Sequence, residues 1–88
     1  MHFKVNVKRC GMGKENIFGM RVYEQRRKLY LNQKELGEKV GLSGKAISTI
    51  ESGTRGTSID KLVELAYLFH VSTDYLLGIT DDPAWRGE

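Results

Sequence analysis

The side chains that offer chemistry in this 88-residue chain are suited to binding rather than to catalysis. Lys45 and Thr49 stand four residues apart, so on a helix both project from one face. A lysine ammonium donates hydrogen bonds, and a threonine offers a hydroxyl and a methyl group. No nucleophile stands in the sequence context of a general base, and His2, Cys10 and His70 are too scattered to hold a metal. We therefore expect no enzyme, no cofactor and no metal site.

The charges of the chain are divided unequally along its length. Residues 1–45 carry 11 Lys/Arg and 4 Asp/Glu (+7), whereas residues 46–88 carry 3 Lys/Arg and 7 Asp/Glu (−4), which leaves a net charge of +3. This asymmetry indicates one side that faces a polyanion and a second side with another role. One cysteine excludes an internal disulfide, and the chain shows neither a signal-like start nor an apolar run of membrane-spanning length. These features predict a cytoplasmic protein without a membrane partner.

Helix start and stop signals predict five helices that would position these side chains. Capping residues precede runs with apolar side chains spaced by three or four. The predicted helices run from about residue 16, over 33–40, 44–52 and 59–69, and from 72 or 73 to 77. The residues assigned to their inward faces are Phe18, Val22, Gln25 and Leu29; Leu36 and Val40; Ala46, Ile47 and Ile50; and Leu62, Leu65, Ala66 and Phe69. Asn32 and Glu35 form a predicted capping box, and Gly41, Gly53 and Gly78 are predicted stops.

The connection between the second and third predicted helices is only Gly41-Leu42-Ser43. A turn of three or four residues that contains glycine is typical of a helix-turn-helix. The second helix of such a pair presents its N-terminal residues outward, in the orientation that enters a major groove.

At residues 19–78 the sequence resembles the lambda/434-type repressor and Cro family of helix-turn-helix domains, also called the XRE family. The matching elements are an arginine-rich first helix followed by L-N-Q-x-E-L, V-G-L-S, I-S-x-I-E-S-G, L-x-x-L-A and V-S-x-D-Y-L-L-G. The order and spacing of these elements together are specific, although each alone is weak. The resemblance implies an all-α, compact five-helix bundle in which residues 33–40 and 44–52 form the helix-turn-helix. It also implies sequence-specific binding to double-stranded DNA, usually as a homodimer on a palindromic operator.

The resemblance assigns DNA contacts to the second helix, the third helix and the loop that follows. It implies that Gln33 contacts a phosphate, that Lys45 and Thr49 read base edges, and that the loop residues Thr54 and Arg55 contact the backbone. The complete predicted DNA-binding set is Gln33, Ser43, Gly44, Lys45, Ser48, Thr49, Ser52, Thr54 and Arg55. Arg21, Arg26, Arg27 and Lys28 are predicted to form a positive flank on the first helix.

Arg26 and Glu51 match a pair that has a structural role in the family. The resemblance implies that this arginine of the first helix meets this glutamate of the recognition helix and holds the two elements in register. Gly44 and Thr57 depart from the family pattern, which often has a long polar side chain and a proline at these positions. Without a side chain, position 44 reads no base, so either fewer bases are read or the helix backbone comes closer to the DNA.

The two ends of the chain are predicted to flank one domain of residues 16–78. Residues 1–15 fit a basic tail or a short strand, and residues 79–88, which contain Trp85, fit an acidic tail. The sequence thus favours a dimeric DNA-binding transcriptional repressor. The alternative is a protein-interaction adaptor or antitoxin-like module that keeps the fold but binds DNA weakly or only with a partner.

Overall fold

The computed structural model describes residues 16–84, and within that range the chain forms five helices and no strand. The helices are α1 (Ile17–Lys28), α2 (Gln33–Val40), α3 (Gly44–Ser52), α4 (Ile59–Phe69) and α5 (Thr73–Leu77). None of these helices combines the length and apolar character needed to cross a bilayer. The predicted all-α bundle is confirmed. The predictions for residues 1–15 and for Trp85 lie outside the described residues.

The helix ends follow the predicted capping signals. Asn32 and Glu35 form the capping box: the Asn32 side chain accepts from the Glu35 amide at 2.7 Å, and the Glu35 carboxylate accepts from the Asn32 amide at 2.8 Å. Two orphan amide groups at the start of α2 are thereby satisfied. Gly41 ends α2 in the left-handed region at φ 75°, where a side chain would be strained. The short connection to α3 therefore forms as the sequence predicts.

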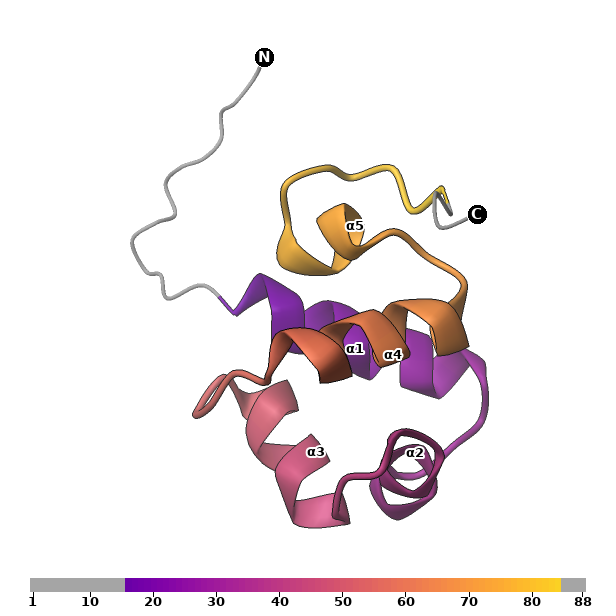
Figure 1. The fold of residues 1–88 in the computed structure, drawn as a ribbon, viewed down its shortest axis with the longest axis vertical. Coiled ribbons are helices and arrows are strands. Elements are labelled where there is room, and N and C mark those ends of the chain that lie inside the picture. Colours follow the sequence, from indigo (N-terminus) through magenta and orange to yellow (C-terminus); the bar gives the residue numbers. More distant parts are fainter. Residues whose placement is uncertain (1–15, 85–88) are drawn as a thin grey trace.

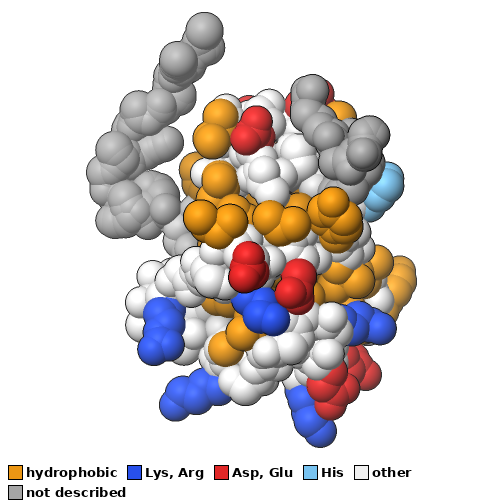
Figure 2. Space-filling model, in the orientation of Figure 1, with side chains coloured by type: hydrophobic (Ala, Val, Ile, Leu, Met, Phe, Trp, Pro, Cys, Tyr) orange, Lys and Arg blue, Asp and Glu red, His pale blue; other side chains and the backbone are white. Residues whose placement is uncertain are grey.

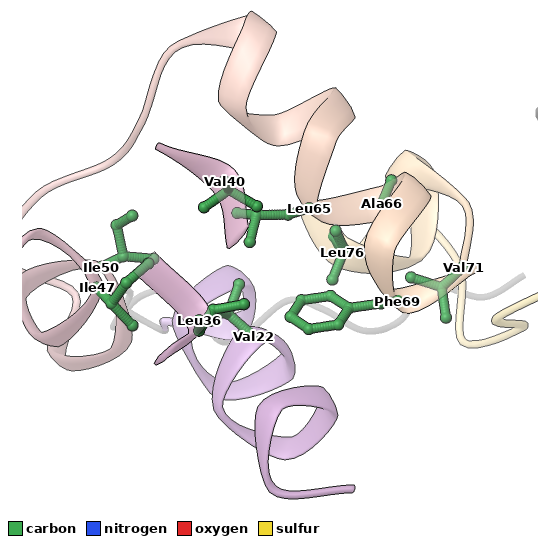
Figure 3. Close-up of a cluster of buried hydrophobic side chains, with 10 residues drawn as sticks. All are labelled: Val22, Leu36, Val40, Ile47, Ile50, Leu65, Ala66, Phe69, Val71 and Leu76. Carbon is green, nitrogen blue, oxygen red and sulfur yellow. The ribbon is translucent and has the colours of Figure 1, made fainter. Parts of the chain in front are cut away.

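α2 and α3 lie at one end of the molecule and α5 lies at the other, with α1 and α4 between them (Figure 1). α1 contacts α3, α4 and α5, so it joins the two ends. Ten buried apolar side chains drawn from all five helices and the α4–α5 connection form one core (Figure 3). Leu36, Ile47, Leu65, Leu76 and Val22 are its largest fully buried members.

Four apolar residues of the predicted inward faces are not among these ten. Phe18 and Leu62 are partly buried against the core, Ala46 is half-buried, and Leu29 is exposed. Leu29 is 44% exposed, although its spacing from Val22 and Gln25 placed it on the inward face of the first helix. Leu29 is the C-terminal cap of α1, and the chain leaves the helical conformation at the next residue, Tyr30, with φ 59°. Burial of Val22 and Gln25 on the same face agrees with the prediction.

The segment that follows α5 is bound to the domain as far as the structure describes it. The Arg21 guanidinium donates to the carbonyls of Tyr75 at 2.6 Å and Thr80 at 2.7 Å, and it pairs with Asp81 at 2.8 Å. The Ser72 amide donates to the carbonyl of Pro83 at 3.3 Å. Residues 79–84, named here the C-terminal segment, therefore extend the packed structure past the predicted boundary at Gly78.

Candidate nucleic-acid interface

The orientation of α3 follows from its cap and its two buried isoleucines. The Ser43 side chain accepts from the Ala46 amide at 3.0 Å, which fixes the first turn. Ile47 and Ile50 are buried in the core. The opposite face therefore points away from the bundle, and Lys45 is exposed on it.

The hydroxyl groups of Thr49, Ser52 and Thr54, on or beside this outward face, are hydrogen-bonded within the protein. Thr49 Oγ1 donates to the carbonyl of Ala46 at 2.9 Å, and Ser52 Oγ donates to the carbonyl of Thr49 at 3.1 Å. Ser52 Oγ also lies 2.8 Å from Thr54 Oγ1. Ser48 and Thr49 are half-buried, whereas Ser52 and Thr54 are exposed. The predicted contact residues of α3 thus share a surface, but their hydroxyl hydrogens are not all available to a ligand.

Arg26 and Glu51 meet beneath this face in a bidentate ion pair. Arg26 Nε donates to Glu51 Oε2 at 2.6 Å and Nη2 donates to Oε1 at 3.0 Å, while Nη1 donates to the carbonyl of Leu31 at 2.9 Å. Only 10% of the Arg26 side chain and 7% of the Glu51 side chain are exposed. The hydrogen bonds to Glu51 raise the pKa of the Arg26 guanidinium above its ordinary value, against the opposing effect of burial. The pair joins α1 to the last turn of α3.

Gln33 belongs to the same cluster, a contact that sequence reasoning missed. Its Nε2 donates to Glu51 Oε1 at 3.0 Å, and the side chain is half-buried. An amide nitrogen carries two hydrogens, so one remains for a further acceptor. We call Arg26, Glu51 and Gln33 the Arg26–Glu51–Gln33 network. It fixes the direction of the one side chain that was predicted to contact a phosphate from the start of α2.

Gly44 has a packing role that the sequence did not reveal. A Cβ at this position would lie 3.3 Å from the Cα of Lys34, which is tighter than most real contacts, and 3.4 Å from its amide nitrogen. The absence of a side chain therefore lets the first turns of α2 and α3 approach each other closely. Gly44 thus eases the packing of α3 against α2, and it leaves position 44 without a side chain that could read a base.

Fewer basic side chains are available on the surface near α3 than the sequence predicts. Two of the four basic residues assigned to the flank of the first helix, Arg21 and Arg26, are engaged with the C-terminal segment and with Glu51. Arg27 and Lys28 remain exposed, as do Lys45 and Arg55. Lysine and arginine side chains project from the end of the molecule formed by α2 and α3 (Figure 2). The periodicity of the first helix could not show which arginines point inward.

Two helices joined by a three-residue turn, with the second presenting an exposed, cationic N-terminal face, define a helix-turn-helix DNA-binding domain. The helix-turn-helix family matches residues 22–76, and the chain belongs to that family.

Two curated relatives from Bacillus subtilis (strain 168) are HTH-type transcriptional regulators. YobD is 37% identical over 67 residues, which cover 76% of this chain and 60% of that protein. ImmR is 42% identical over 60 residues, which cover 68% of this chain and 47% of that protein. The chain thus spans about half to three-fifths of the length of these relatives.

Two solved structures share the fold. The P22 c2 repressor, in complex with a synthetic operator, superposes with a TM-score of 0.66 and is 35% identical, with 68% of this chain and 91% of that chain covered. The N-terminal DNA-binding domain of SinR from Bacillus subtilis gives a TM-score of 0.65 at 28% identity, with 72% and 93% covered. These relatives bind DNA or regulate transcription, and none of them is described as an enzyme.

Proposed function

We propose that this chain is a sequence-specific, cytoplasmic transcriptional repressor that binds a palindromic operator in double-stranded DNA as a homodimer. The observation that carries the proposal is the exposed face of α3, where Lys45 projects beyond the buried Ile47 and Ile50. A lysine in the major groove donates to guanine O6 or N7. The fold similarity to the P22 c2 repressor, which is solved on an operator, supports the same use of α3.

Contacts to the DNA backbone would flank this base-reading face. Gln33 at the start of α2 keeps one amide hydrogen for a phosphate, and helix N-termini favour anions. Ser43 accepts a bond from Ala46 and still has a hydroxyl hydrogen to donate. Arg55 is exposed in the loop after α3. These three residues would set the position of the domain on the duplex, whereas Lys45 would specify the sequence.

The test is a binding titration of the full chain against the duplex upstream of its own gene. Lys45→Ala is expected to weaken binding about tenfold or more, because a specific base contact is lost. Lys39→Ala is the matched control, since it removes the same charge from an exposed position in the last turn of α2. A weakening of equal size in both variants would indicate a general charge effect and contradict base reading by Lys45. Failure to bind any duplex would favour the adaptor instead.

The homodimer part of the proposal rests on the exposed surface of α4. Ile59, Val63 and Tyr67 follow one another at intervals of four residues and are 77%, 39% and 61% exposed. Apolar side chains form a band along α4, on the side away from α2 and α3 (Figure 2). Antiparallel packing of two α4 helices would place Val63 on a two-fold axis and leave both α3 helices accessible. A second copy of the chain is therefore the occupant that we propose.

Sedimentation of a charged variant tests this interface. Val63→Glu is expected to shift the chain to monomer and to weaken binding to a two-half-site operator while a single half-site is bound as before. Met20→Glu makes a similar change at a 56% exposed apolar residue of α1 and serves as the control. A monomeric wild-type chain that binds the full operator without cooperativity would contradict the dimer and leave DNA binding intact.

A further inference from the structure

The hydroxyl hydrogen of Thr49 is used in a hydrogen bond to the backbone of its own helix. Its Oγ1 lies 2.9 Å from the carbonyl oxygen of Ala46. A carbonyl oxygen only accepts hydrogen bonds, so the threonine must be the donor. A hydroxyl has one hydrogen. Thr49 therefore presents to an outside ligand only lone pairs and a methyl group.

The N-terminal end of α3 presents the opposite chemistry. Lys45 has three donor hydrogens and no acceptor. Ser43 Oγ accepts from the Ala46 amide and keeps its own hydrogen to donate. Donors thus stand at the start of α3, and one turn after Lys45 an acceptor stands beside a methyl group. The two positions are suited to different base edges.

The major groove offers this second combination in one base pair. An A·T pair displays the N6 amino group of adenine, which is a donor, and the C5 methyl group of thymine. A guanine displays only acceptors at O6 and N7, and cytosine has an amino group without the methyl. The lone pairs of Thr49 match the amino group, and its methyl matches that of thymine.

We infer that Thr49 selects an A·T base pair, accepting from the adenine amino group through Oγ1 and packing its methyl against that of thymine, while its donated bond to Ala46 prevents it from reading guanine. This inference rests on the proposed function, because it requires α3 to lie in the major groove. It assigns opposite preferences to two residues of one face: guanine to Lys45 and A·T to Thr49.

The experiment begins by selecting duplexes from a random-sequence pool with the wild-type chain and with Thr49→Val. Valine has nearly the same shape and keeps a methyl group but has no acceptor. The wild type is expected to select A·T at one position of each half-site, and Thr49→Val is expected to lose that preference at that position alone. Its affinity for the wild-type operator should fall about 3- to 10-fold, the value of one hydrogen bond.

Base analogues then separate the two contacts. Replacing the adenine by purine, which lacks the amino group, should weaken wild-type binding but leave Thr49→Val unchanged. Replacing the thymine by uracil should weaken the wild type but leave Thr49→Ser, which has lost the methyl group, unchanged. Equal losses in wild type and variant would overturn the inference, as would selection of G·C at the position that Thr49→Val alters.

The design distinguishes failure of this inference from failure of the proposed function. If the wild-type chain enriches no duplex, DNA binding by α3 is wrong and the inference falls with it. If it enriches an operator whose sequence Thr49→Val does not change, DNA binding stands and only the role of Thr49 is wrong. Thermal unfolding of both threonine variants shows whether α3 is intact, and Thr49→Ser retains the bond to Ala46.

Discussion

Arg21 and Arg26 lie five residues apart on α1 and bind opposite ends of the molecule in different ways. Arg26 meets a carboxylate that is 7% exposed, on the side of α2 and α3. Arg21 meets two backbone carbonyls, the ring of Tyr75 at 4.1 Å and a carboxylate, Asp81, that is 98% exposed. Both arginine side chains are themselves largely buried, so the two regions differ in the burial of the carboxylate that each arginine meets.

This difference in burial determines how much each ion pair contributes to the stability of the fold. Removing Glu51 would leave the charge of Arg26 buried without a counter-charge. Such a loss destabilises a protein strongly, even where replacing both partners by apolar residues would not. Removing Asp81 would leave Arg21 with its carbonyl partners and with water. We therefore expect the helix-turn-helix end to depend on a charge pair and the C-terminal segment to depend on hydrogen bonds to backbone.

Glu51→Gln tests the buried pair and should have the largest effect. We expect the free energy of unfolding to fall by about 3–5 kcal/mol, because Arg26 loses its counter-charge. Urea unfolding followed by circular dichroism measures it. Glu38→Gln removes the same charge from an exposed residue of α2 and is the control. An unchanged midpoint in Glu51→Gln would show that the pair has no structural role.

The pH dependence of the same measurement carries a definite sign. The pKa of Arg26 is raised in the folded protein, so its contribution is complete below the ordinary pKa of arginine and is lost only as pH rises through the higher folded value. The stability difference between wild type and Glu51→Gln should therefore stay constant from neutral to mildly alkaline pH.

Arg21→Ala tests the other end of the comparison. The variant loses two charge-assisted hydrogen bonds to the carbonyls of Tyr75 and Thr80, for which we expect a loss of about 2 kcal/mol. Arg21 Nη1 donates to both carbonyls, while Nη2 pairs with Asp81 and the guanidinium lies over the ring of Tyr75. Arg21→Lys keeps the charge and one donor nitrogen, but it has neither the second nitrogen nor the planar group. We expect it to recover only part of the loss. A lysine variant as stable as the wild type would show that charge alone holds the C-terminal segment.

The contacts of the two arginines also show which features of the structure the sequence could predict and which it could not. Caps such as Asn32 and stops such as Gly41 act within a few residues, so the helix bounds follow from local patterns. The Arg26–Glu51 pair was accessible only through the family resemblance. The partners of Arg21 are 54 to 60 residues distant and two of them are backbone carbonyls, which no side-chain pattern encodes. The bond between Gln33 and Glu51 joins two side chains 18 residues apart on different helices, so the local pattern around Gln33 does not predict it either.

Gln33→Ala should have a small effect on stability and a larger one on DNA binding. Its hydrogen bond to Glu51 is worth about 1 kcal/mol, and Glu51 keeps both bonds to Arg26. Affinity for the operator should fall about 3- to 10-fold if the second amide hydrogen binds a phosphate. Because a phosphate contact carries no sequence information, the loss should be similar for specific and non-specific duplexes. A loss of stability as large as that of Glu51→Gln would contradict this division of roles.

Asp81→Asn should have the smallest effect on stability of the variants considered. It removes only the exposed ion pair of Arg21 and keeps the bonds to the two carbonyls. The carboxylate is exposed to water, where an ion pair gains little and is screened by salt. We expect a urea midpoint that cannot be distinguished from that of the wild type, both at low salt and in molar sodium chloride. If Asp81→Asn instead unfolded as easily as Arg21→Ala, the ion pair and not the carbonyls would hold the C-terminal segment. The two arginines would then act in the same way despite the different burial of their partners.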